Sequence, residues 1–583
     1  MNSGAATGGN QGDSAADAIA RVRFAMQSND LAGARRIAED GRRAHPSNAA
    51  LADTAGDLAL KSGDAVAAVE RFKAACELEP SSLDYVLNHA IALQRLERHG
   101  DAIALLSAHE KAGRTVPRYG SIRALSHRTL GQAAKAAHWY DAVLSLEPHH
   151  PRALHGRARV AIERGEADAV ARFDAALAVT QGDADLWLGK AQALEVAGDV
   201  AGARAIAQQL CSQAPGFIAA LSFLSGMRLA AGEADFTTPF RAAAAKAPQD
   251  PNIPATHAET LAGLDYAGEA AEIAAAARAR FPNEAHFTLL EAVHSGSAGD
   301  LERAEAAFAQ LPRSTPHLAV HEARHRIRTK EFDRADDLLN QALEQKPWDI
   351  TAWSLRAIVW RVLANAGDAA AQARAAWLHE QTGLIQMRSL CGRDGLVDDA
   401  ADYLRELHAG SAMPLGQSLR GGTQTRGILF HRTEAILGEL HDAIAATLEE
   451  YRRDLPAADV THPLLRLRDA PWRLAGSWSV RLTEGGDHHS AHIHPLGAIS
   501  SALYLTVPDA ASGPDQQGWL EVGRPKADLG LNLGPIKVIE PKPGHLALFP
   551  STAYHGTTPF SSGPSDGPAT KAERMTVAFD VVS

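Results

Sequence analysis

A ladder of prolines is the feature that most constrains how this chain can fold. Successive prolines of the ladder are 34, 68, 67, 33, 34, 30 and 35 residues apart, so two steps are double periods and the others lie close to one unit of 34. A fixed period of this length indicates a structural unit repeated many times, and it absorbs much of a length of 583 residues. The ladder consists of Pro46, Pro80, Pro148, Pro215, Pro248, Pro282, Pro312 and Pro347.

Small and aromatic residues recur at fixed positions ahead of these prolines. Small residues let the two helices of a hairpin approach each other, an aromatic side chain fills the space above them, and proline ends the second helix. Each unit is unstable alone, so we expect stacked units that bury one continuous core. The positions are Gly56, Ala68, Phe72 and Ala75 before Pro80, Ala136 and Tyr140 before Pro148, and Ala335 and Ala342 before Pro347.

Glycines followed by acidic residues mark the expected turns between helices, because glycine readily adopts positive φ and the acid can cap the next helix. These pairs are Gly63-Asp64, Gly165-Glu166 and Gly198-Asp199.

The whole pattern resembles the tetratricopeptide repeat. We therefore expect a disordered segment over residues 1–13 and an all-α tetratricopeptide solenoid over residues 14–385. The resemblance implies that a peptide or protein binds in the concave groove of the array, without identifying that ligand.

The composition changes near residue 400, where the 34-residue period fades and glycines, histidines and short β-rich runs take over. We expect a linker or helical connection over residues 386–409 and a second domain over residues 410–583. A helical period follows His431, after which the period becomes two and several short strands predict a sandwich or barrel of the jelly-roll kind. The expected strands are 476–482, 498–507, 518–523, 536–540, 545–549 and 574–582.

Histidines cluster in this second domain. Four lie within seven residues, where a uniform spread of the 26 histidines would place about 0.3. In a strand, residues two apart point the same way, so His492 and His494 can aim at one point. His488 and His489, like His545, are interpreted as core or surface residues.

Two later features belong with this cluster. A predicted strand delivers His555 just past a Phe-Pro corner. Arg574 then opens the last predicted strand, and Thr576 and Ala578 alternate onto its face. An arginine that begins an otherwise apolar strand is costly to bury without an anion partner.

The series HIHP, SSALYL, GWLEV, PKPGHLALFP, YHGTTP and RMTVAF resembles the iron(II)/2-oxoglutarate-dependent oxygenases, in particular a branch with an HxHP motif. The resemblance covers residues 410–583 and implies a double-stranded β-helix, or jelly roll. It implies that His492 and His555 ligate iron(II). Most of the superfamily has a carboxylate where His494 stands, so three imidazoles would replace the two-histidine, one-carboxylate triad. Two alternatives are that His494 points away and water completes the site, or that Asp487 folds back as the carboxylate.

The same resemblance implies which residues bind the cosubstrate 2-oxoglutarate. Arg574 would pair with the distal carboxylate of 2-oxoglutarate, with Thr576 and Tyr504 as further contacts. Arg420 and Arg426, in a glycine-rich loop, would contact substrate or hold that loop. The stretch 556–573 is interpreted as an inserted flexible loop that includes the sequence SSGPSDGPATKAE.

These features predict an iron(II)/2-oxoglutarate-dependent dioxygenase that uses molecular oxygen to hydroxylate a peptide or protein recruited by the array. Two alternatives are a non-catalytic scaffold with a degenerate barrel and a three-histidine iron dioxygenase that does not use 2-oxoglutarate. A formal charge of −11 disfavours nucleic acid as a partner. Three dispersed cysteines suggest a reducing cytoplasm, and neither an export signal nor an apolar run of membrane-spanning length is expected.

Overall fold

The computed structural model describes residues 14–315, 317–483, 487–560 and 573–583. The predicted disordered segment 1–13, and residues 561–572 of the predicted inserted loop, lie outside these ranges. The chain divides between Gly189 and Lys190 into two compact units, which are described separately. No described helix combines the length and the apolar character that crossing a bilayer requires.

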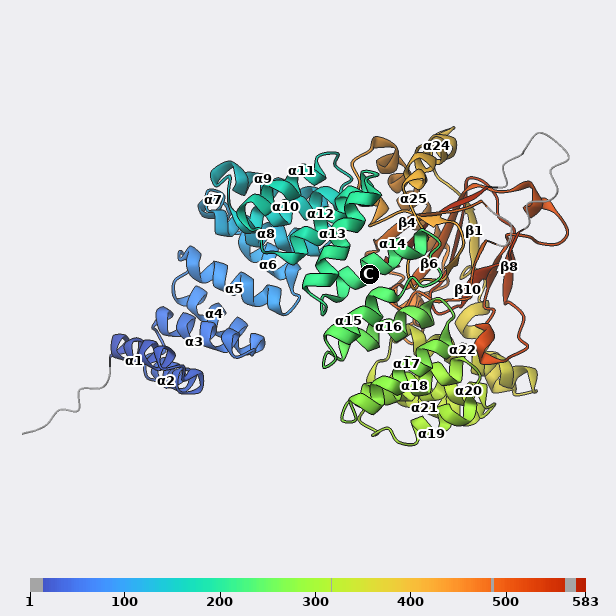
Figure 1. Ribbon diagram of the computed structural model, residues 1–583, viewed down its shortest axis with the longest axis horizontal. Coiled ribbons are helices and arrows are strands. Elements are labelled where there is room, and N and C mark those ends of the chain that lie inside the picture. The colour runs from blue at the N-terminus through green and yellow to red at the C-terminus, as the bar shows by residue number, and fades with distance from the viewer. Residues whose placement is uncertain (1–13, 316, 484–486, 561–572) are drawn as a thin grey trace, which may run out of the picture. The chain divides into compact units, whose positions relative to one another are not determined.

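The first unit consists of helical hairpins, as the repeat predicts, and carries the array as far as α12 (Figure 1). Its helices are α1 Ala15–Gln27, α2 Leu31–Ala44, α3 Ala49–Lys61, α4 Ala65–Leu78, α5 Leu83–Arg95, α6 His99–Ser107, α7 Glu110–Gly113, α8 Pro117–Thr129, α9 Ala133–Leu146, α10 Pro151–Glu163 and α11 Ala169–Val179, and α12 Ala184–Val196 crosses the division.

The repeat positions pack as expected. Phe72 is buried, and a Cβ added at Gly56 would lie only 2.8 Å from its ring, so a larger residue could not occupy that position without displacement. Gly63 has a φ of 81°, and the side chain of Asp64 accepts a hydrogen bond from the amide of Ala67 at 3.0 Å, which caps α4. The small and aromatic positions therefore set the helix spacing, and the glycine-acid pairs set the turns.

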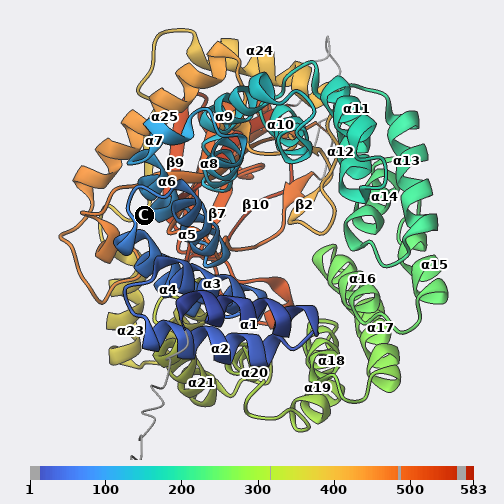
Figure 2. The same cartoon turned by 90° about the vertical axis from the view of Figure 1, so that its left-hand side faces the viewer.

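The array continues in the second unit, where successive hairpins from α14 to α19 follow one another in Figure 2. These helices are α13 Val200–Gln213, α14 Ile218–Ala230, α15 Thr238–Lys246, α16 Asn252–Gly263, α17 Ala267–Arg280, α18 Ala285–Ser297, α19 Leu301–Phe308, α20 Leu318–Arg328, α21 Phe332–Gln345, α22 Ile350–Asn365 and α23 Ala369–Ala375, followed by the π-helical turn η1 Ala376–Glu380.

The rest of the second unit is built on antiparallel sheets, which confirms the predicted order of a helical solenoid followed by a jelly-roll-like domain. Its strands are β1 Gln386–Ser389, β2 Leu419–Arg420, β3 Thr423–Gln424, β4 Arg473–Leu482, β5 His488–His489, β6 Ile499–Thr506, β7 Leu520–Val522, β8 Lys537–Ile539, β9 His545–Pro550, β10 His555–Thr557 and β11 Arg574–Val582. Two α-helices, α24 Leu396–Ala409 and α25 Ala435–Asp454, accompany them, with the short 3-10 turns η2 Leu429–His431, η3 Leu465–Leu467, η4 Asp509–Ser512 and η5 Ala527–Leu529.

The described strands form three sheets and do not close into a barrel. The large sheet has the order β1-β9-β6-β11-β4-β3, a small sheet has the order β10-β7-β8, and β2 pairs with β5. All six expected strands are present. The stretch 386–409, expected as a linker or helical connection, contains the helix α24 and also β1, which pairs with β9 at the edge of the large sheet. This pairing could not be predicted from the sequence, because β1 is short and its partner lies about 160 residues away in the chain.

Alternation along β11 separates the two faces of the large sheet. Met575, Val577 and Phe579 are buried in a core shared with leucines of α24 and α25. Arg574 and Thr576 point to the opposite face, toward the small sheet. The helices therefore cover one face of the large sheet and leave the other face free to build an interior site.

The segments that flank the strands of the small sheet rest on the array. Leu529, Leu533 and Tyr554 belong to one buried cluster with residues of α20, α21 and α22, and we call this cluster the array seam. Polar contacts flank it. Arg328 pairs with Asp528 at 2.5 Å and also donates to Ser297.

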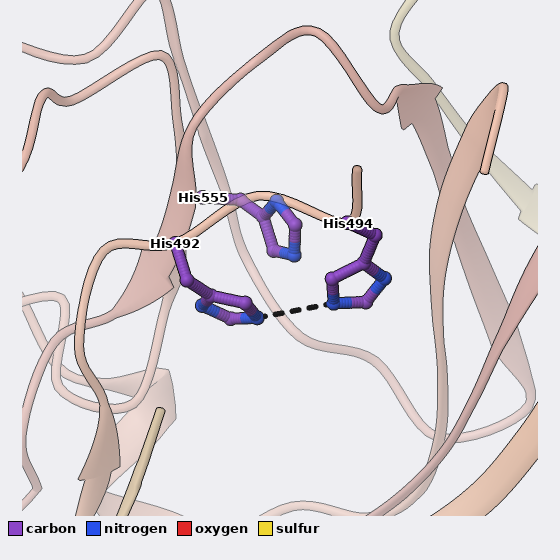
Figure 3. Close-up of side chains that lie close together, drawn as sticks. All are labelled: His492, His494 and His555. Atoms are coloured by element: carbon purple, nitrogen blue, oxygen red, sulfur yellow. Dashed lines mark hydrogen bonds between the residues drawn. The ribbon is translucent and has the colours of Figure 1, made fainter. Parts of the chain in front are cut away.

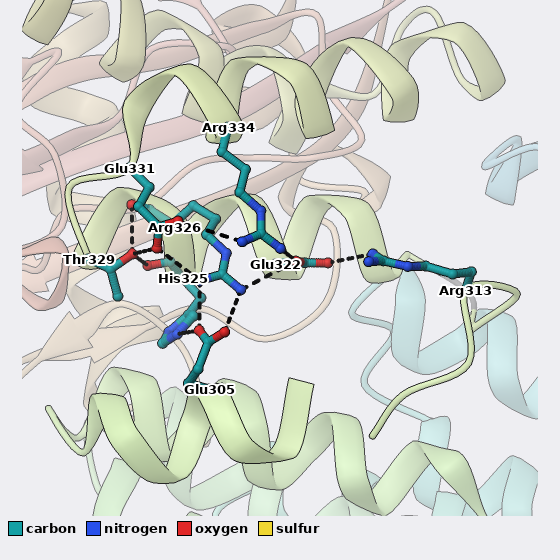
Figure 4. A network of polar contacts seen from close by, with 8 residues as sticks. All are labelled: Glu305, Arg313, Glu322, His325, Arg326, Thr329, Glu331 and Arg334. Atoms are coloured by element: carbon teal, nitrogen blue, oxygen red, sulfur yellow. Dashed lines mark hydrogen bonds and ion pairs between the residues drawn. The ribbon is translucent and has the colours of Figure 1, made fainter. Parts of the chain in front are cut away.

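Helix α20 is itself fixed by a buried polar network (Figure 4). Arg326, which is 4% exposed, donates to both carboxylate oxygens of Glu305 at 2.6 and 2.8 Å and to Glu331 at 2.9 Å. Glu322 lies at the edge of this network and pairs with Arg313 and Arg334 from either side. A buried cation with several carboxylate partners holds its helix in one orientation, since removing a partner would leave an uncompensated charge.

We expect Leu529→Ala to lower the free energy of unfolding of the second unit by about 2–5 kcal/mol, because it removes a side chain that is 1% exposed from the array seam. Urea denaturation followed by fluorescence measures this. Val460→Ala is the control, since Val460 is 80% exposed and its truncation should change stability by less than about 0.5 kcal/mol. Equal effects of the two substitutions would contradict the conclusion that packing at the array seam stabilises the second unit.

Candidate metal centre

The backbone brings two of the predicted ligands together directly. His492 and His555 form an isolated antiparallel bridge in which each amide donates to the other residue's carbonyl at 2.9 Å. His555 begins β10, whereas His492 lies outside any named strand and pairs through this single bridge. A reciprocal pair of hydrogen bonds fixes both Cα positions, so the two side chains start from a rigid base.

Each of the three histidines has an acceptor at its Nδ1 atom. The acceptor is the Ser490 carbonyl at 2.8 Å for His492, the Ala553 carbonyl at 3.3 Å for His555, and the Asp580 carboxylate at 2.5 Å for His494. A neutral imidazole that donates from Nδ1 keeps an acceptor lone pair on Nε2. The hydrogen-bond pattern thus assigns the tautomer that leaves Nε2 available.

The donor atoms of these three histidines converge. One nitrogen from each ring lies within 4.8 Å of the others, and Figure 3 shows the rings turned toward one another. The Nε2 atoms of His492 and His494 are 3.1 Å apart. Two lone pairs at that distance repel unless a cation lies between them, so this donor set fits a metal ion, and imidazole is a suitable ligand for iron.

The structure departs from both alternatives considered for the third metal ligand. His494 is turned toward His492 and does not point away. Asp487 accepts a hydrogen bond from the amide of Thr483 at 3.1 Å and is not part of the cluster.

Burial keeps the imidazoles of His492 and His555 neutral. It lowers the pKa of His492 to about 3, with the neighbouring His494 adding to the effect. Burial, followed by His492 and His494, also holds the pKa of His555 well below its usual range. Neutral imidazoles are the form that binds metal, so the ligands need not lose protons near pH 7.

Arg574 lies in the same cavity as the histidines and is 2% exposed. Its Nε atom has no hydrogen-bond partner among the described residues, and no ion pair within those residues involves it. Its guanidinium carbon lies 5.3 Å from the centre of the Tyr504 ring, and the hydroxyl of this buried tyrosine is also unpartnered in the described part of the chain. Burial lowers the pKa of Arg574, because removing a guanidinium from water disfavours its charged form. An anion bound beside this buried guanidinium would stabilise it.

Other side chains complete the cavity. Thr576 lines it from the same face of β11 as Arg574. His489, interpreted from the sequence as core or surface, also lines it, with its ring 5.8 Å from that of His492. Trp478 packs 5.5 Å from the ring of His494. The cavity therefore has imidazoles at one end and a guanidinium at the other.

The structure does not bring Arg420 and Arg426 into this cavity as free side chains. Arg420 donates to Asp265 at 2.8 and 2.5 Å, and Arg426 pairs with Glu195. Both carboxylates belong to the array, so of the two roles considered for these arginines the structure favours holding the loop. The carboxylate partners lie 155 and 231 residues away in the chain, which is why the sequence did not reveal them.

Asp580 was missed from the sequence, although a signal for it existed. The alternation that assigned Arg574, Thr576 and Ala578 to one face continues to Asp580 two residues later. Extending the pattern by one step would have found it. Only the fold could show that it meets His494.

These features define a helical repeat protein with a jelly-roll-like domain that holds a candidate three-histidine metal centre. Comparison with known families agrees with this description. Residues 476–580 match a family described as "Putative 2OG-Fe(II) oxygenase", and residues 54–117 and 167–216 match one described as "Tetratricopeptide repeat". The match to the oxygenase family thus spans every candidate ligand.

Tetratricopeptide and pilus proteins are among the solved structures similar to the chain. A tetratricopeptide repeat protein from Parabacteroides merdae is 19% identical, with 42% of this chain and 96% of that chain covered and a TM-score of 0.36. The type IV pilus biogenesis factor PilW is 19% identical over 37% and 100% of the two chains, with a TM-score of 0.34. YrrB, a TPR protein with an unusual peptide-binding site, is 16% identical over 30% and 89%, with a TM-score of 0.27. No curated protein matches the chain.

We expect His492→Ala and His555→Ala each to abolish tight binding of Fe(II), measured by anaerobic calorimetry on the full chain. The loss should exceed the roughly 10–100-fold that follows removal of a residue that only orients a ligand. His545→Ala is the matched control, because this histidine is bonded to the carbonyl of Pro543 and lies outside the cluster. Binding that survives in either ligand variant would contradict this assignment.

Proposed function

We propose that the protein is an iron(II)/2-oxoglutarate-dependent dioxygenase that hydroxylates a peptide or protein side chain. The observation that carries the proposal is one cavity with three convergent imidazole nitrogens at one end and, at the other, the buried Arg574, which has no ion-pair partner among the described residues. The match of residues 476–580 to the oxygenase family supports it. Iron(II) with 2-oxoglutarate would supply the oxidising chemistry, in which molecular oxygen is used to hydroxylate a C–H bond.

In this proposal His492, His494 and His555 hold the metal, and the bridge between His492 and His555 keeps two of them in register. Three neutral ligands leave the charge of the ion uncompensated at the site itself, which favours an anionic cosubstrate bound beside it.

Arg574 binds the far carboxylate of that cosubstrate. Its planar guanidinium can donate two parallel hydrogen bonds, a geometry that lysine cannot match. The hydroxyls of Tyr504 and Thr576 lie on the same side of the large sheet, and Tyr504 pairs with Thr576 across β6 and β11. Because all three residues are at most 4% exposed, the interactions form away from bulk water, where they are strongest.

The array supports a macromolecular substrate. Tetratricopeptide repeats generally bind peptides or proteins, and tethering a substrate near the cavity raises its effective concentration there. The described part of the array in the second unit is joined to the oxygenase-type domain by a packed seam and by ion pairs, so a captured segment would be held close to the cavity. We place the protein in the cytoplasm, which three unpaired cysteines support.

One observation favours a second candidate. Three histidines without a carboxylate ligand also suit an iron dioxygenase that does not use 2-oxoglutarate. Arg574 would then bind a carboxylate of the substrate.

Anaerobic addition of Fe(II) and 2-oxoglutarate to the full chain tests the proposal without knowledge of the substrate. We expect the weak visible absorption band of iron chelated by a 2-oxo acid. In Arg574→Ala, the concentration of 2-oxoglutarate needed for half of the band should rise at least about 30-fold, equivalent to ~2 kcal/mol, because the far carboxylate loses a buried charged partner.

Arg524→Ala is the control, since Arg524 pairs with Glu521 on the surface and should leave the band unchanged. Iron binding without the band would favour the second candidate. Failure to bind iron would leave a scaffold protein whose jelly-roll domain serves only in binding.

A further inference from the structure

Asp580 is placed by a local irregularity of the large sheet. The register between β11 and β4 shifts between Asp580 and Val581, where Ala475 of β4 is left without a partner in β11. Such a bulge changes the direction of nearby side chains and increases the local twist. On its other side Asp580 keeps regular pairing with Ser500 of β6. The carboxylate is therefore held by strands on both sides, and it shares the inward face with Arg574.

The HIHP segment turns directly over this carboxylate. After His494 the chain makes a turn, and the amide of Ala498 donates to the carbonyl of Val581 at 2.8 Å. A Cβ added at Gly497 would lie 3.2 Å from the Cβ of Asp580 and 3.2 Å from the Oγ of Ser551, so a larger residue at this turn would crowd the Asp580 side chain.

The contact that results is short and shielded. His494 Nδ1 lies 2.5 Å from an oxygen of Asp580, with the two side chains 14% and 19% exposed. Of the three histidines, His494 is the one whose Nδ1 faces a carboxylate, whereas His492 and His555 face backbone carbonyls. A charge-assisted hydrogen bond of this kind is about twice as strong as a neutral one and fixes both the tautomer and the plane of the ring.

We propose that Asp580 is the positioning residue of the metal centre and supplies through His494 the carboxylate that the ligand set lacks. The carboxylate does not ligate the metal itself but contacts the Nδ1 atom of the ligand His494. Asp580 orients the Nε2 atom of His494 toward the other two imidazoles and offsets part of the charge of a bound cation across the ring. This inference rests on the metal-binding part of the proposed function and does not depend on 2-oxoglutarate.

The experiment is a titration of the full chain with Fe(II), and separately with Co(II), under anaerobic conditions. Asp580→Asn should weaken metal affinity about 10–100-fold, because the amide cannot match the charge or the acceptor strength of the carboxylate. The visible spectrum of the Co(II) form should shift as the geometry at His494 relaxes. Asp580→Glu, which keeps the carboxylate, should recover part of the affinity.

Two comparisons separate this role from a general effect on folding. Asp487→Asn changes another buried carboxylate of the same domain that lies outside the cluster, and it should leave metal affinity unchanged. In a His494→Ala background, Asp580→Asn should cause no further loss, because its effect passes through the ring. If Asp580→Asn alters folding, Gly497→Ala offers a second way to displace the same contact.

The inference would be overturned if Asp580→Asn bound metal as tightly as the parent chain. It would also be overturned if Asp580→Asn weakened metal binding as much in the His494→Ala background as in the parent chain. A parent chain that binds neither ion would overturn both this inference and the proposed function. Metal binding without a 2-oxoglutarate band would overturn only the proposed function.

Discussion

The candidate site depends on the packing of its ligand-bearing segments against the end of the helical array. Along HIHP and the start of β10, inward and outward side chains alternate. His492, His494 and His555 point into the cavity, while Ile493 and Tyr554 pack on the array seam. Each ligand is thus next to a residue whose burial requires the array. The array seam therefore holds the segments that carry the imidazoles in place, so the repeats of the second unit are part of the site's structure.

A second constraint is the distribution of charge along β11. This strand carries Arg574 at its start and Asp580 near its end on the same inward face, while the residues between them alternate into the core under α24 and α25. Within the described part of the chain the guanidinium has no carboxylate partner, whereas the carboxylate pairs with His494. One strand therefore supplies both a binding group for an anionic cosubstrate and a support for the metal, and neither charge compensates the other.

The sequence predicted features that rest on local patterns. The 34-residue ladder gave the array, period-two runs gave six strands, and spacing with family resemblance gave His492, His494, His555 and Arg574, which the structure brings into one cavity. Features that depend on distant partners were not accessible. These features are the pairing of β1, the ion pairs of Arg420 and Arg426, and the contact between His494 and Asp580. Their partners lie 86 to 231 positions apart in the chain. The strand β1 is also too short to give a clear pattern.

Anomalous diffraction from crystals of the full chain, grown anaerobically with Fe(II) and 2-oxoglutarate, tests the central claim most directly. The account predicts one iron peak bonded to Nε2 of His492, His494 and His555, with a 2-oxo acid whose far carboxylate meets Arg574. It also predicts that Asp580 remains on Nδ1 of His494. Iron at any other position, or a metal bound with His494 turned away and Arg574 unoccupied, would contradict it.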